Sequence, residues 1–140
     1  MSLRIVQLGS ARRHGEGIRL GTVRRPPRGV RKTQYAKQDW FDIWLPNLSP
    51  SAALMRKTSI GEDGTGWRNF ERSFRAELRQ PDKSHLLDAL AALSHNTNFS
   101  VGCYCNDEQC CHRSILRAEL KKRGALISPG LIPRRLWRIE

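Results

Sequence analysis

Residues 99–124 read FSVGCYCNDEQCCHRSILRAELKKRG, and this stretch decides the fold because it places a strand, a loop and a helix in direct succession. The mostly apolar run over residues 99–104 predicts a buried strand. Further on, apolar residues recur at helical spacing and are followed by three basic residues and Gly124, which is a typical helix end. We therefore expect a strand that leads into a helix running from near Cys110 to Arg123.

Shorter patterns of the same two kinds precede this stretch. Short apolar or alternating segments predict strands at residues 3–8, 17–23 and 41–45. Capping residues and amphipathic spacing predict helices at residues 49–57, 67–78 and 81–93. Strands that alternate with helices predict an α/β fold, in which a short, mostly parallel sheet is flanked by helices.

Single residues add two details to these helices. Ser49 precedes Pro50, so we expect Ser49 to be the N-cap of its helix and the proline to occupy the first helical position. In the helix over residues 81–93, four leucines are expected to face inward: Leu86, Leu87, Leu90 and Leu93.

The chain has 140 residues, which suits one domain with a single core. We assign residues 1–125 to this domain and residues 126–140 to a basic, proline-punctuated C-terminal extension. No apolar run is long enough to span a membrane, and the first residues lack the pattern of a signal peptide. The sequence therefore predicts a cytoplasmic protein with no membrane partner.

Positive charge is concentrated in the first third of the chain. Residues 1–38 contain ten Lys and Arg but one acid, Glu16, and the formal net charge of the whole chain is +12. Residues 24–32 read RRPPRGVRK, in which two prolines exclude a helix interior and indicate a rigid loop. Such a loop can hold phosphates at a low entropy cost. We expect four of its cations to bind an anionic ligand: Arg24, Arg25, Arg28 and Lys32.

The cysteine-rich segment 103–113 has three interpretations. In the first, Cys105, His112 and Arg113 complete an anion pocket with the arginine-rich loop, because they lie at a strand end and a helix start. In the second, thiols and imidazole bind zinc, with ligands drawn from Cys103, Cys105, Cys110, Cys111 and His112. In the third, the thiols are buried small apolar groups and the histidine is a hydrogen-bonded core residue.

Cys111 and Arg117 also match C-x5-R, a spacing that is known from phosphate cradles. Such a cradle needs a glycine-permissive loop between the cysteine and the arginine. The intervening residues include Ile115 and Leu116 at helical spacing, so we expect a helix here instead of a cradle.

Several motifs occur in a characteristic order. They are the segment 21–32, Trp40, the segment 48–54, Trp67 with Phe70, and the triplet Cys111-His112-Arg113. In this order the chain resembles the domain of unknown function 488 family over residues 18–124. The resemblance implies an α/β domain of bacterial or archaeal type whose biochemical function is unassigned.

Together these patterns predict a cleft between the arginine-rich loop and the segment 103–113. We expect it to bind a phosphate-bearing ligand, a nucleotide or nucleic acid, through the arginines. Cys105 is the candidate nucleophile and His112 the candidate general acid or hydrogen-bond donor, and no cofactor is expected. The alternative function is a non-catalytic interaction module that zinc stabilises at the cysteine cluster.

Overall fold

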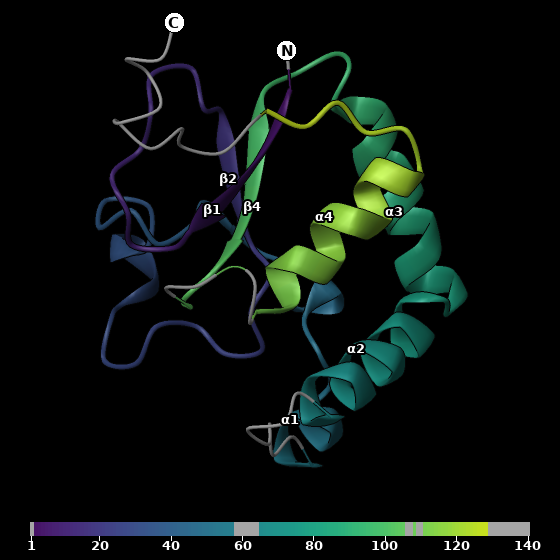
Figure 1. Ribbon diagram of the computed structural model, residues 1–140. Coiled ribbons are helices and arrows are strands. Elements are labelled where there is room, and N and C mark those ends of the chain that lie inside the picture. The colour runs from purple at the N-terminus through teal and green to yellow at the C-terminus, as the bar shows by residue number, and fades with distance from the viewer. Residues whose placement is uncertain (1, 58–64, 106–107, 109–110, 129–140) are drawn as a thin grey trace, which may run out of the picture.

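The centre of the protein is a four-stranded parallel sheet (Figure 1). The structure is a computed structural model, which describes residues 2–57, 65–105, 108 and 111–128. The order of the strands across the sheet is β1 (Leu3–Gln7), β4 (Phe99–Cys103), β2 (Ile18–Gly21) and β3 (Ile43–Trp44). All three pairings are parallel. The predicted α/β class with a parallel sheet is therefore confirmed.

The described residues form four α-helices in the order that the sequence predicts, three of them between β3 and β4 and one after β4. They are α1 (Ala52–Lys57), α2 (Thr65–Leu78), α3 (Pro81–Leu93) and α4 (His112–Lys122), and two short 3-10 helices are η1 (Lys32–Gln34) and η2 (Pro46–Leu48). Figure 1 shows α2, α3 and α4 together on one side of the sheet. None of the helices within the described residues is long and apolar enough to cross a membrane.

The main core lies between the sheet and these helices. Strand residues such as Leu3 and Val101 pack in one cluster with Phe74 of α2 and Leu116 of α4. A second, smaller cluster joins Phe41 with Cys103 and Cys111, so two of the cysteines are buried where β4 ends and α4 begins. Cys103 and Cys111 are thus part of the packing that holds α4 to the sheet.

The start of α1 differs from the prediction. Ser51, and not Ser49, caps the helix: the Leu54 amide donates to the Ser51 hydroxyl at 3.1 Å, and the helix begins at Ala52. Ser49 is buried, and its carbonyl group and that of Pro50 accept hydrogen bonds from the Arg24 guanidinium. Because these two carbonyl groups accept hydrogen bonds from Arg24, the helical hydrogen bonds begin two residues later, at the Ser51 carbonyl.

The inward face of α3 also differs at one position. Leu87, Leu90 and Ala91 are buried, whereas Leu93 is 48% exposed. The buried residues follow the spacing i, i+3 and i+4, and the next buried position is Ser94. Leu93 therefore lies outside the apolar stripe, and its prediction as a core residue was wrong.

The last helix ends as expected. Gly124 has a φ of +86°, and the Ala125 amide donates to the Leu120 carbonyl at 3.0 Å. This geometry is the Schellman motif, which glycine adopts without steric cost. Beyond it, Leu126 and Ser128 form backbone hydrogen bonds with Leu3, so the first residues of the expected extension lie against β1. Residues 129–140 lie outside the described part of the chain.

A buried ion pair connects the strands to the loops that precede them. Arg19 of β2 is 0% exposed, and its guanidinium donates to the Glu16 carboxylate at 2.8 and 3.1 Å. The Ser100 hydroxyl of β4 donates to the same carboxylate at 2.7 Å. Burial would raise the pKa of Glu16, but the hydrogen bonds from Arg19, Ser100 and the Arg13 amide outweigh it and hold this pKa at about 2.

We predict that Glu16→Gln leaves the buried Arg19 guanidinium without its counter-charge. The free energy of unfolding at pH 7, measured by urea denaturation, should fall by about 3–5 kcal/mol. Because folding lowers the Glu16 pKa from 4.5 to about 2, the stability from this group is present above about pH 4.5 and is lost as the pH falls towards 2. The difference between wild type and variant should therefore shrink across that range.

The control for this prediction is Glu71→Gln, which removes a carboxylate from a surface ion pair with Arg75. It should change the free energy of unfolding by about 1 kcal/mol or less. If Glu16→Gln cost the same at pH 7 and at pH 3, the assignment of the low pKa to Glu16 would be wrong.

Candidate functional site

The candidate site lies where β2 and β4 end. Parallel strands bring their carboxyl ends to the same edge of a sheet, and ligands of open α/β sheets bind there. Thr22 follows β2, and its amide and its hydroxyl donate to the Gly102 carbonyl of β4 at 3.0 and 2.9 Å. The Tyr104 hydroxyl, just after β4, donates to the Arg25 carbonyl at 2.9 Å. These bonds fix the start of the arginine-rich loop, residues 24–32, beside the end of β4.

Two adjoining cavities open at this edge. The first has a volume of about 430 Å³, and its wall includes Arg24, Arg25, Cys103, Cys105 and His112. The second, of about 870 Å³, is lined by Arg25, Arg28, Trp40 and Tyr104 among others. Arg25 and Tyr104 line both cavities, so they mark the boundary between them. The first cavity brings the arginine-rich loop and the cysteine cluster together.

The predicted cations of the arginine-rich loop differ in what they contact. Arg24 donates to the carbonyl groups of Pro50, Ser49 and Pro46 at 3.0, 3.0 and 3.2 Å, so its guanidinium holds the loop to the segment before α1. Lys32 lies in η1 and lines a different cavity with Phe41 and Trp44. The four cations were predicted to bind one ligand together, but Arg24 binds backbone carbonyl groups and Lys32 lines a different cavity.

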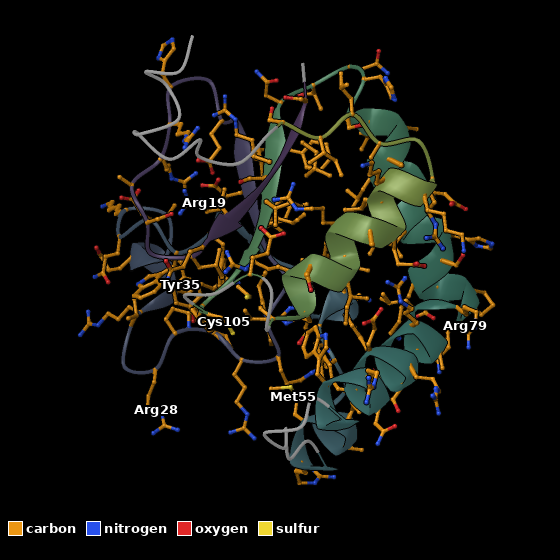
Figure 2. All side chains as sticks on the ribbon, in the orientation of Figure 1. Arg19, Arg28, Tyr35, Met55, Arg79 and Cys105 are labelled. Atoms are coloured by element: carbon orange, nitrogen blue, oxygen red, sulfur yellow. The ribbon has the colours of Figure 1, made fainter. Side chains whose placement is uncertain are left out.

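Arg25 and Arg28 remain available to a ligand. Both are exposed, and neither forms an ion pair with an acidic residue in the part of the chain that the structure describes. Figure 2 shows the Arg28 side chain pointing away from the body of the protein. Among the described residues, their guanidinium groups carry unneutralised positive charge beside the two cavities, as does the exposed Arg56 side chain in the lining of the first cavity.

Three thiols and one imidazole form the cysteine cluster, which consists of Cys103, Cys105, Cys111 and His112. The sulfur atoms of Cys103 and Cys111 and a ring nitrogen of His112 all lie within 4.8 Å of one another. Cys105 lies close enough to the other two thiols for both to affect its pKa. Cys103 and Cys111 are buried and Cys105 is exposed. Cys110, a predicted metal ligand, lies outside the described residues.

The orientation of His112 is set by the backbone. Its Nε2 atom lies 2.6 Å from the Thr22 carbonyl oxygen, and a carbonyl oxygen only accepts, so Nε2 carries the hydrogen. In the neutral ring, Nδ1 then presents its lone pair to the Cys111 sulfur at 3.7 Å. The edge of the ring also packs against Phe74. The imidazole nitrogen that faces the cluster is thus free to accept a proton or to bind a metal ion.

The pKa values of the Cys103 and Cys111 thiols shift in opposite directions. A hydrogen bond from the Cys103 thiol lowers the pKa of Cys111 against the effect of burial, and the Arg113 amide lowers it further. The same hydrogen bond and burial raise the pKa of Cys103. Burial, followed by the neighbouring Cys111, raises the pKa of Cys105, the predicted nucleophile. The structure thus favours a thiolate on Cys111, at the N-cap of α4.

Arg113 supports the loop after β4. It is 3% exposed, and its Nη2 atom donates to the Cys105 carbonyl at 2.6 Å. Among the described residues its Nε atom has no hydrogen-bond partner. The buried Arg113 guanidinium binds the backbone of Cys105. Arg113 therefore holds Cys105 in place in the cavity wall.

The C-x5-R spacing does not form a phosphate cradle. Residues 112–117 are the first residues of α4, as the apolar spacing predicts. Arg117 forms an ion pair with Glu108, with Nη2 donating to a carboxylate oxygen at 2.9 Å. Its charge is therefore neutralised and it is not part of the cysteine cluster.

A parallel α/β domain with a Cys-His-Arg triplet at the start of its last helix is the arrangement that the sequence motifs led us to expect. The chain belongs to the DUF488 family: residues 3–124 match DUF488-N3a, which is described as the active DUF488-N3 subclade. No curated protein and no solved structure matches the chain. The predicted family is therefore confirmed, and the match covers the sheet, the arginine-rich loop and the cysteine cluster.

We predict that Arg24 contributes to stability, because three backbone carbonyl groups depend on it. Arg24→Ala should lower the free energy of unfolding by about 1–3 kcal/mol. Arg24→Lys should restore little of it, since an ammonium group cannot reproduce the fork of a guanidinium. Urea denaturation measures both, with Arg28→Ala as the control, which should stay within about 0.5 kcal/mol of wild type. Equal stability of Arg24→Ala and wild type would show that these bonds are dispensable.

Proposed function

We propose that this protein binds a phosphate-bearing ligand, a nucleotide or nucleic acid, in the first cavity and its neighbour. One observation carries the proposal: the guanidinium of Arg25 has no acidic partner among the described residues and lines the same cavity as Cys105 and His112. An arginine binds a phosphate in a bidentate manner, and the cavity wall keeps water from competing on one side. Arg25 is therefore the main anion contact.

The shape and charge of the second cavity support a ligand with more than one part. Arg28 adds a second cation there, and Trp40 and Tyr104 add aromatic rings whose centroids lie 5.8 Å apart. Nucleobases stack on such rings regardless of their sequence. A nucleotide with its phosphate at Arg25 has room for its base in this cavity. The excess positive charge of the chain, +12, attracts such anions over longer distances.

A fixed loop favours binding. Arg24 and Tyr104 hold the start of the arginine-rich loop through hydrogen bonds that their side chains donate to backbone carbonyl groups. The loop therefore loses little freedom when a ligand arrives, and less of the interaction energy is spent on ordering it.

Chemistry on the ligand is a further part of the prediction. Cys105 and His112 line the same cavity as Arg25, so a ligand at Arg25 lies close to a thiol and an imidazole. Thiols and imidazoles serve as nucleophiles and acid–base groups. The description of the subclade as active supports chemistry on a ligand bound in this cavity.

We also propose a bacterial, cytoplasmic location. The four cysteines lie within nine positions, too close together to join distant parts of the fold by disulfides. This spacing suits a reducing compartment, in which thiols serve as ligands or reactive groups.

We predict that Arg25→Ala weakens the binding of phosphate-bearing ligands. With a fluorescent nucleoside triphosphate and a labelled single-stranded oligonucleotide as probes, fluorescence anisotropy should show an affinity about tenfold lower. The slope of log K against log salt should become shallower by about 1 for the oligonucleotide, because one phosphate contact is lost.

Arg79→Ala is the matched control. It removes the same charge from the end of α2, which Figure 2 shows on the opposite side of the molecule from Arg28. Its affinity should stay close to that of wild type. The proposed function would be wrong if wild type bound neither probe, or if Arg25→Ala and Arg79→Ala had the same affinity and the same salt dependence.

A further inference from the structure

We infer that Cys103, Cys111 and His112 form a zinc site whose fourth coordination position faces the first cavity. This inference concerns the cysteine cluster alone and goes beyond the proposed binding function, which depends on Arg25.

The distances between the donor atoms suit a tetrahedral ion. Zinc bonds are about 2.3 Å long to sulfur and 2.0–2.1 Å long to nitrogen, so neighbouring ligand atoms of a tetrahedral site lie about 3.5–3.8 Å apart. The two sulfur atoms and the ring nitrogen all lie within 4.8 Å of one another, and the Cys111 sulfur is 3.7 Å from Nδ1 of His112. Side-chain rotations that bring the donor atoms closer together by up to about 1 Å place all three at bonding distance of one ion.

The backbone prepares His112 for this role. Metal-binding histidines donate their second ring N–H to a carbonyl or carboxylate group, which fixes the tautomer and the direction of the ring. His112 makes this bond to the Thr22 carbonyl at 2.6 Å. Thr22 is itself fixed to Gly102 through its amide and its hydroxyl. The lone pair of Nδ1 is therefore held towards the sulfur atoms before any ion binds.

The kind of donor selects the kind of ion. Two thiolates and one imidazole are the soft and borderline ligands that zinc prefers, whereas magnesium and calcium prefer oxygen. Two thiolates also neutralise a divalent ion, so the complex adds no net charge to a buried position. No other group of three such side chains is found in the described residues.

The cavity beside the cysteine cluster leaves one coordination position of the ion open. Cys103 and His112 line the first cavity and Cys111 does not, and both cysteines are buried, with Cys103 1% and Cys111 2% exposed. An ion between these three residues is thus reached from the cavity. Three protein ligands with an open fourth position are typical of catalytic zinc, whereas structural zinc has four protein ligands. Cys105 is exposed and does not belong to the group within 4.8 Å, so we assign it no zinc bond.

Metal content of the full chain is the first test. The protein is purified without a chelator and without a metal-affinity tag, and zinc is measured by mass spectrometry of the elements. We expect about one zinc ion per chain. Cobalt in place of zinc should give the thiolate charge-transfer absorption and the intense visible bands of a tetrahedral site. Protein with no bound zinc that also gives only the weak spectrum of octahedral cobalt would overturn the inference.

Variants then test the ligand assignment. Cys111→Ser and His112→Ala should each lower the affinity for zinc at least about tenfold, measured by competition with a zinc-binding dye. Cys105→Ser and His85→Ala, which change the same residue types outside the three ligands, should keep the zinc. Loss of zinc in Cys105→Ser, or full retention in both Cys111→Ser and His112→Ala, would overturn the assignment.

The two proposals fail independently. Arg25→Ala should keep its zinc while it loses affinity for phosphate-bearing probes. A wild-type protein that binds these probes but no zinc contradicts the metal site alone, and one that binds zinc but no probe contradicts the proposed binding function alone.

Discussion

The buried ion pair between Arg19 and Glu16 holds four separate segments of the chain together. The guanidinium binds the Glu16 carboxylate and also the carbonyl groups of Ser10 and Asp39, while Ser100 of β4 donates to the same carboxylate. These bonds connect the loop after β1, the two central strands and the segment before β3. Loss of either partner leaves the other charge buried and unpaired, so this region opens only at a large cost. The strand ends that carry the site therefore have a rigid base.

Arginine has two opposite tasks in this protein, and only the contacts of each residue separate them. Arg24 and Arg113 donate to backbone carbonyl groups, so they fix the two loops that border the first cavity. Arg25 and Arg28 have no acidic partner in the described residues and lie beside the cavities. A chain with such an excess of arginine can thus use some of these side chains as scaffold and present others to an anion. Arg24 and Arg25 are neighbours, yet they fall into different groups.

The different contacts of these arginines explain why only part of the structure could be predicted from the sequence. Periodicity predicted the strands, α2 and α3 within a few residues, although apolar spacing does not report burial at every position: Leu93 of α3 and Ile43 and Trp44 of β3 are exposed. It misplaced the cap of α1 because Arg24 binds the Ser49 and Pro50 carbonyl groups, a contact across 25 residues that no local pattern shows. The cysteine cluster was visible as a group, but its internal order was not. Thr22 orients His112 through a backbone carbonyl, and a backbone atom leaves no signature in the sequence. The position of Cys111 directly before the helix was the sequence signal for a thiolate on this cysteine, because a helix N-terminus stabilises a thiolate.

Charge links the two halves of the first cavity. Arg25 in the wall of the first cavity would attract a phosphate, whereas a thiolate on Cys111, which does not itself line the cavity, would repel it. A divalent ion bound to two thiolates removes this repulsion, because the charges of the three groups cancel. The open position of such an ion would then accept an oxygen atom of the same ligand that Arg25 holds. A zinc ion at Cys103, Cys111 and His112 therefore makes the cysteine cluster compatible with an anionic ligand.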